Sequence, residues 1–175
     1  MKIRTLTPLD AARYQTLRLA ALQTEASHFG ASYEQERMYS KERIEQRLAI
    51  SQDRCLFGAF DDDEHCPDGQ RLIGMVALNR DDRKKFSHKG SLTAMYVTPT
   101  ARGRGIGRAL LTRAIETART VPELLQLVLT VNAGNHKAIA LYASLGFSVF
   151  GLEPSGIQVD GMFYDELWMY LRLRQ

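Results

Sequence analysis

The stretch from Leu92 to Leu111, LTAMYVTPTARGRGIGRALL, constrains this chain more than any other. It begins as an extended apolar run, breaks at Pro99, passes through a turn rich in glycine and arginine, and ends as the start of an amphipathic helix. A strand–turn–helix of this kind leaves unpaired backbone N–H groups at the helix start, where the positive end of the helix dipole also lies. Such helix starts bind phosphate groups. The stretch therefore predicts a pyrophosphate-binding turn.

The spacing of the glycines separates three phosphate-binding motifs. A P-loop requires Lys and then Ser or Thr after its last glycine, where this chain has Arg108 and Ala109. A dinucleotide-binding fingerprint that begins at Gly103 requires Gly or Ala at position 108. Neither of these two motifs fits, but the glycines still allow a phosphate close to the main chain and the arginines add positive charge. A tight strand–helix connection without a ligand is the structural alternative.

Composition limits the class of protein. At 175 residues the chain is long enough for one domain with a substantial core, which we expect to span residues 1–175. A net charge of +3, evenly spread, is too small to indicate nucleic-acid binding. Cys55 and Cys66 provide neither a disulfide framework nor the spacing of a zinc site, and no apolar run is long enough to span a membrane. We therefore expect a cytoplasmic protein without a metal, nucleic-acid or membrane partner.

Periodicity and turn signals predict seven strands and four helices. The expected strands are 1–7, 55–60, 71–78, 91–97, 124–131, 147–159 and 162–171, and the expected helices are 9–24, 41–51, 106–121 and 135–145. Residues 25–39 follow no clean period and are expected to form a loop with a helical turn. Because the glycine turn leads from the fourth strand through a helix to the fifth, these two strands should be parallel in a mostly antiparallel sheet. The fold class is mixed α/β.

Two motifs with the correct order and spacing carry a family resemblance. The first is R-x-x-G-x-G from Arg102, after the Tyr96-Val97-x-Pro99 strand end, and the second is N-x-x-A-x-x-L-Y-x-x-x-G-F from Asn135. Together they resemble the GNAT superfamily of N-acetyltransferases. The well-matched part spans residues 92–150, and the element order along the rest of the chain agrees.

This resemblance implies that the fourth and fifth strands splay apart around acetyl-CoA as co-substrate. Main-chain groups at the end of the fourth strand would then hold the pantetheine arm and the thioester carbonyl, while the glycine turn would hold the pyrophosphate. The cofactor-binding residues implied in this way are Met95, Tyr96, Val97, Arg102, Gly103, Arg104, Gly105, Ile106, Gly107, Arg108, Asn135 and Tyr142.

Acyl transfer to an amine needs an uncharged nucleophile, stabilisation of the oxyanion and a proton for the leaving thiolate. The resemblance implies that Tyr142 supplies this proton as the catalytic residue, whereas its sequence position alone would indicate a buried core aromatic. The general base is left open. In the ribosomal-protein N-terminal acetyltransferases a Glu stands five residues before the motif Asn, where this chain has Thr130, which cannot act as a base. The other candidates are Glu34, Glu36, His88, Asp165 and Glu166.

The acceptor is expected to be a primary amine, either a small molecule or a peptide N-terminus, attacked directly in a ternary complex. Superfamily members build the acceptor wall from the loop after the first helix and from the last hairpin, which here implies Phe29, Tyr33, Glu34 and Tyr164. Analogy to the superfamily also favours a homodimer. The alternative is a non-catalytic acyl-CoA-binding sensor or regulatory module, and a nucleotide-binding domain is a third hypothesis.

Overall fold

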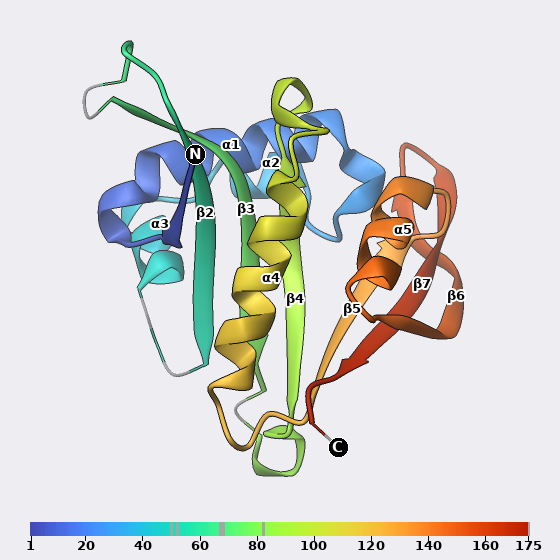
Figure 1. The fold of residues 1–175 in the computed structure, drawn as a ribbon. Coiled ribbons are helices and arrows are strands. Elements are labelled where there is room, and N and C mark those ends of the chain that lie inside the picture. The colour runs from blue at the N-terminus through green and yellow to red at the C-terminus, as the bar shows by residue number, and fades with distance from the viewer. Residues whose placement is uncertain (50, 52, 67–68, 82, 175) are drawn as a thin grey trace.

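The computed structural model describes residues 1–175 except 50, 52, 67, 68, 82 and 175. Within the described residues, seven strands form one sheet in the order β1-β2-β3-β4-β5-β7-β6 (Figure 1). The strands are β1 (Lys2–Thr5), β2 (Arg54–Asp62), β3 (Gln70–Arg80), β4 (Lys89–Val97), β5 (Gln126–Asn132), β6 (Ser148–Val159) and β7 (Met162–Arg172). The helices are α1 (Ala11–Thr24), α2 (Tyr33–Glu36), α3 (Lys41–Leu48), α4 (Ile106–Arg119) and α5 (His136–Ser144). The predicted mixed α/β class and four helices are confirmed, and α2 is one further turn.

The neighbouring strands are antiparallel except β4 and β5, which are parallel as predicted. These two strands pair only from Lys89–Gln126 to Ser91–Val128, and beyond that point they separate (Figure 1). A bulge in β4 lies just after the last pair. There, Ala94 and Met95 together face Val76 of β3, and Ala94 has a φ of +54°. A bulge bends a strand and increases its twist, so β4 turns away from β5.

The sheet has an apolar core on each face, because successive side chains of a strand point to opposite faces. On one face, residues such as Phe57 pack with Leu110 of α4 and with Tyr142 of α5. On the other, residues such as Leu56 pack with Tyr14 of α1 and with α3. The helices thus form layers on both sides of the sheet, with α4 and α5 on the same side (Figure 1).

Local signals set the ends of the helices largely as predicted. The Ser40 hydroxyl accepts the Arg43 N–H at the start of α3 (3.3 Å), and the Asn135 amide oxygen accepts the Ala138 N–H at the start of α5 (3.1 Å). The predicted first helix instead begins with a 3₁₀ turn over Pro8–Asp10, followed by α1 from Ala11. None of the described helices has the length and apolar run needed to cross a bilayer.

The loop between α1 and α3, which borders the cavity described below, is anchored by one buried carboxylate. Glu36 is only 2% exposed. Its two carboxylate oxygens accept two hydrogen bonds from the Arg18 guanidinium (3.1 and 3.0 Å) and one from Arg47 (2.9 Å). Burial alone would raise the pKa of Glu36, but the hydrogen bonds and charges of these arginines outweigh it and lower the pKa. Glu36 is therefore an ionised structural group and not a proton acceptor for the reaction.

Replacing Glu36 by Gln should lower the free energy of unfolding at pH 7 by about 3 kcal/mol, because two guanidinium groups lose their buried partner. Since the folded-state pKa is lowered, the contribution of Glu36 is present above the ordinary pKa of 4.5 and is lost as the pH falls through the folded-state pKa. Urea unfolding at several pH values measures this difference. The exposed Glu34→Gln variant is the control, and equal stability of the two variants would contradict the anchoring role.

Candidate active site

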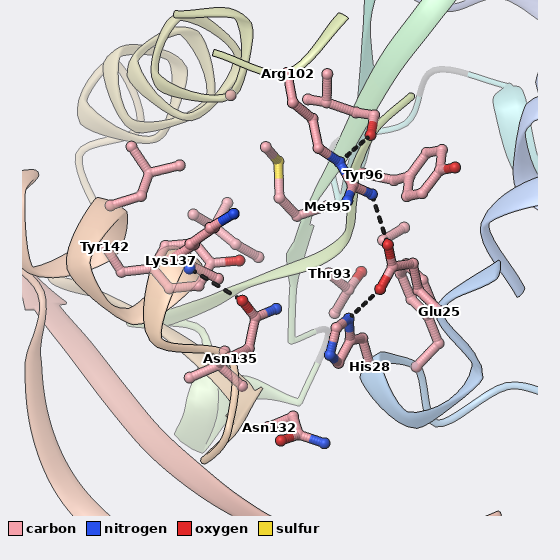
Figure 2. Close-up of a pocket in the computed structure, with 18 of the residues that line it drawn as sticks. Glu25, His28, Thr93, Met95, Tyr96, Arg102, Asn132, Asn135, Lys137 and Tyr142 are labelled. Atoms are coloured by element: carbon pink, nitrogen blue, oxygen red, sulfur yellow. Dashed lines mark hydrogen bonds and ion pairs between the residues drawn. The ribbon is translucent and has the colours of Figure 1, made fainter. Parts of the chain in front are cut away.

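A cavity of about 660 Å³ lies in the gap between β4 and β5, bordered by the start of α4, by α5 and by the loop after α1 (Figure 2). The structure brings together at this cavity almost every residue predicted to bind the cofactor. Those that line it are Met95, Tyr96, Val97, Arg102, Gly103, Gly105, Ile106, Gly107, Arg108, Asn135 and Tyr142.

Of the remaining predicted residues, one lines the cavity and the others lie outside its lining. Phe29 lines the cavity and packs against Tyr96, with ring centroids 6.4 Å apart. Arg104 does not line it, because its guanidinium forms an ion pair with Asp61 at the end of β2 (2.8 Å). The other predicted acceptor residues are also outside the lining. These are Tyr33 and Glu34 on the short helix α2 and Tyr164, which pairs with Ile157 in the outer hairpin.

The start of α4 is a candidate anion site at one end of the cavity. Its first backbone bond runs from the Ala109 N–H to the Gly105 carbonyl (3.0 Å), so the N–H groups of Ile106, Gly107 and Arg108 have no acceptor within the helix. Gly105, at the N-cap of α4, has a left-handed backbone conformation with a φ of +76°. A Cβ at Gly107 would lie 3.2 Å from the side chains of both Met95 and Leu141, so only glycine lets the turn approach the cavity wall without displacement.

Two cations beside this anion site are unpaired. Arg108 donates to the Ser144 hydroxyl (2.7 Å), and Lys137 lies at the start of α5. Neither forms an ion pair with any residue that the structure describes. Sequence reasoning missed Lys137, although its position two residues after the motif Asn135 is a usable signal. Together with the positive end of α4, these side chains favour a ligand that carries several negative charges.

The open edge of β4 presents main-chain groups to the cavity. The Thr98 N–H donates to the Ile73 carbonyl of β3 (2.9 Å). Because N–H groups alternate along a strand, the Val97 N–H faces the opposite side, where β5 has separated from β4. The Val97 carbonyl on the same side accepts the Arg102 Nε–H (3.0 Å). A backbone N–H in this position can stabilise an oxyanion formed in the gap.

Tyr142 and Asn135 face this edge from α5 (Figure 2). Tyr142 is 7% exposed and packs edge-on against Phe147, with centroids 6.0 Å apart. Burial raises the pKa of Tyr142 to about 12, which makes it a weaker acid than a free tyrosine but keeps its phenol protonated at neutral pH, so that the proton is present for transfer. The oxygen of the Asn135 amide caps α5, and its NH₂ group has no partner among the described residues, so it can donate to a ligand.

The structure also shows which of the carboxylates considered as a general base line the cavity. Glu166 lines the cavity next to Thr130, since the pairings Asn132–Glu166 and Thr130–Trp168 place these side chains on one face of the sheet. Burial, and to a smaller extent the charge of Glu153, raises the pKa of Glu166, and a hydrogen bond with Thr130 acts in the opposite direction. Asp165 is outside the cavity lining and accepts the Ser155 N–H (2.8 Å).

The loop after α1 contributes two titratable groups that sequence reasoning missed. Glu25 and His28 both line the cavity, and the His28 Nδ1 lies 3.0 Å from a Glu25 carboxylate oxygen (Figure 2). The second carboxylate oxygen of Glu25 pairs with Arg102 (2.7 Å). No group of three His, Cys, Asp or Glu side chains in the described part of the chain is arranged to hold a metal ion.

Gly105→Ala should weaken coenzyme A binding about five- to tenfold, measured by calorimetry. Alanine at a φ of +76° costs about 1 kcal/mol or more, and the turn relieves this strain by rotating its N–H groups away from the anion. Gly69→Ala is the matched control, because Gly69 has a φ of +68° in the β2–β3 connection outside the cavity. Equal affinities for the two variants and the wild type would show that the turn binds no phosphate.

Comparison with known proteins agrees with this geometry. A spermidine N(1)-acetyltransferase from Vibrio cholerae is 30% identical over 102 residues, which cover 58% of this chain and 57% of that protein. The chain spans about half the length of the curated relatives that it matches. An acetyltransferase of the GNAT family from Streptococcus pneumoniae has a TM-score of 0.84 and 28% identity, and the match covers 98% of both chains.

A putative acetyltransferase from Salmonella typhimurium, solved with its cofactor acetyl-CoA, has the same fold. Its TM-score is 0.80 at 23% identity, and the match covers 100% of this chain and 95% of that one. The sequence pattern of the acetyltransferase (GNAT) family matches residues 18–147, a range that includes both motifs at the cavity. Because this range is well over half of the sequence, the chain belongs to the acetyltransferase (GNAT) family.

Proposed function

We propose that the chain is an acetyl-CoA-dependent N-acetyltransferase that acetylates a primary amine by direct attack in a ternary complex. One observation carries this proposal: a single cavity joins an anion-binding helix start, an open strand edge and a buried, protonated phenol. Coenzyme A has a polyanionic end and an extended amide-bearing arm, which match the first two features. The relative that acetylates spermidine and the similar structure with bound acetyl-CoA support the same assignment.

In this assignment the pyrophosphate lies at the start of α4, and the pantetheine arm lies along β4. An extended chain with amide groups can hydrogen-bond to a free strand edge as an added strand does. Such an edge exists only beyond Ser91, where the β4–β5 pairing ends. A pantetheine arm along this edge would bring the thioester to the Val97 N–H and the Tyr142 hydroxyl.

The reaction then needs no covalent acyl-enzyme. The amine nitrogen forms a bond to the thioester carbon, the oxyanion is stabilised by the Val97 N–H, and the C–S bond breaks as Tyr142 protonates the sulfur. Neither cysteine lines the cavity, and burial raises the pKa of Cys55, which disfavours its thiolate. Attack by the amine itself is therefore the simplest route.

The acceptor side of the cavity fits a cationic amine with an apolar part, either a small molecule or a peptide N-terminus. Phe29 and Tyr96 provide an apolar wall, and Glu166 provides a carboxylate without an ion pair among the described residues. We propose a single N-acetyltransferase domain over residues 1–175. A cytoplasmic location is also proposed, since both cysteines are free thiols.

We further propose a homodimer formed through the β6–β7 hairpin. β6 is an edge strand, and large apolar side chains such as Phe150 and Phe163 are exposed on this hairpin. Phe150 packs edge-on against Trp168 and Tyr170. Exposed apolar surface of this kind marks association sites. Sedimentation at increasing concentration should show a dimer that Phe150→Glu dissociates, and a wild-type monomer at every concentration would refute the proposal.

The alternative, a non-catalytic acyl-CoA sensor, shares the cofactor site but not the need for Tyr142. Tyr142→Phe should lower kcat by about 10²-fold or more with little change in coenzyme A affinity, because only the proton donor is lost. Thiol release during turnover of a panel of amines measures kcat. Tyr39→Phe is the control for loss of a tyrosine hydroxyl, because Tyr39 lies outside both the cavity lining and the proposed dimer hairpin.

Binding and turnover together separate the three hypotheses. Coenzyme A and acetyl-CoA at about 100 times their Kd should raise the melting temperature by roughly 5–10 °C. A rise with ATP or NAD alone would support a nucleotide-binding domain instead. Binding of coenzyme A without acetylation of any amine would favour the sensor, and unchanged turnover in Tyr142→Phe would remove Tyr142 from the mechanism.

A further inference from the structure

We propose that His28, held by Glu25, is the general base that deprotonates the acceptor amine, an inference that rests on the proposed function. An amine substrate arrives mostly as an ammonium ion and must lose a proton before it can attack a thioester. Glu36 is occupied by two arginines, Thr130 has no basic group, and His88 is outside the cavity lining, in the β3–β4 connection. The dyad of Glu25 and His28 lies on the acceptor side of the cavity.

The hydrogen bonds of Glu25 determine which ring nitrogen of His28 is free. Glu25 accepts from Arg102 at 2.7 Å, and its other oxygen lies 3.0 Å from the His28 Nδ1. An ionised carboxylate can only accept hydrogen bonds, so Nδ1 carries the donated proton. In a neutral imidazole this leaves the lone pair on Nε2. Nε2 is turned away from Glu25, toward the space that Thr93, Asn132 and Asn135 border (Figure 2).

The loop that carries His28 is held in place from two sides. The Asn132 side-chain NH₂ of β5 donates to the Ser27 carbonyl (3.0 Å), and the His28 N–H donates to the Glu25 carbonyl (2.9 Å). Phe29 packs on Tyr96 of β4. The imidazole is thus positioned relative to both strands that border the gap, as a proton acceptor must be.

Glu25 and Arg102 are the charged groups next to His28, and Glu25 pairs with both His28 (3.0 Å) and Arg102 (2.7 Å). The His28 side chain is 30% exposed, which provides a route for releasing the proton to solvent. The other charged side chains that line the cavity are Arg18, Arg108, Lys137 and Glu166.

His28 and Tyr142 together account for every proton that moves in the reaction. The ammonium loses one proton to the Nε2 of His28, which later passes it to water. The neutral amine forms the N–C bond as the thioester carbonyl becomes an oxyanion. On collapse the C–S bond breaks, the thiolate takes the phenolic proton of Tyr142, and the nitrogen gives its extra proton back to the tyrosinate. The products are the amide, the free thiol and one proton in solution.

The test is kinetic and uses an amine that the wild-type chain acetylates in the panel above. His28→Ala should lower kcat/KM by about 10²- to 10⁴-fold and remove the acid limb of its pH profile, while the coenzyme A affinity stays within about twofold. Added imidazole should restore part of the activity. Glu25 is a positioning residue, so Glu25→Gln should lower kcat/KM less than His28→Ala and should not respond to imidazole.

The matched control is His65→Ala. His65 is also paired with a carboxylate, Asp63 at 3.2 Å, but it is 97% exposed and outside the cavity lining, so its loss should leave kcat/KM unchanged. Activity of His28→Ala within about threefold of wild type would overturn the inference. Loss of the acid limb in Glu166→Gln but not in His28→Ala would overturn it as well, and would assign the base to Glu166. A wild-type chain that acetylates no amine would refute the proposed function itself.

Discussion

The short parallel pairing of β4 and β5 is the constraint on which the rest of the structure depends. α4 must cross from the end of one strand to the start of the other, so both strands begin side by side, but only three residue pairs connect them. The bulge at Ala94 then turns β4 away. This separation creates the cavity, frees the Val97 edge, and leaves the start of α4 at the mouth of the gap. Full pairing along both strands would remove all three features.

The second feature of the site is that its charges are arranged for two different ligands. Arg108, Lys137 and the start of α4 favour a polyanion, while Glu166 favours a cation. Arg102 belongs to the glycine turn, yet its guanidinium binds both the Val97 carbonyl and Glu25, which in turn holds His28. One chain of hydrogen bonds therefore runs from the cofactor motif to the acceptor-side loop.

The sequence was sufficient to predict the elements and many of the residues that line the cavity, because these depend on local chemistry. The caps at Ser40 and Asn135, the glycine turn and the period of α4 are all visible in short windows of sequence. The bulge was not predictable, since Ala94 is an ordinary strand residue whose positive φ arises from the sheet around it. Arg104 is a predicted cofactor residue that lies outside the cavity lining, because the alternation of glycine and arginine does not show which arginines the turn directs elsewhere.

Most of the predicted acceptor residues lie outside the cavity lining, and the reason is again a tertiary contact. Glu25 and His28 meet Arg102 only when the loop after α1 folds over the end of β4, a contact between segments far apart in the sequence. The prediction of Tyr33, Glu34 and Tyr164 rests on the elements that carry them, but their positions on α2 and in the β6–β7 hairpin lie outside the cavity lining. Where a loop residue lies is set by contacts with distant segments, so the hydrophobic period of the local sequence does not predict it.

A crystal structure of the chain with coenzyme A tests the central claim most directly. The account predicts that the pyrophosphate lies on the N–H groups at the start of α4 and that the pantetheine arm lies between β4 and β5. The sulfur should then lie within hydrogen-bonding distance of the Tyr142 hydroxyl. Coenzyme A bound outside the gap, or a gap closed by renewed β4–β5 pairing in the complex, would contradict the account.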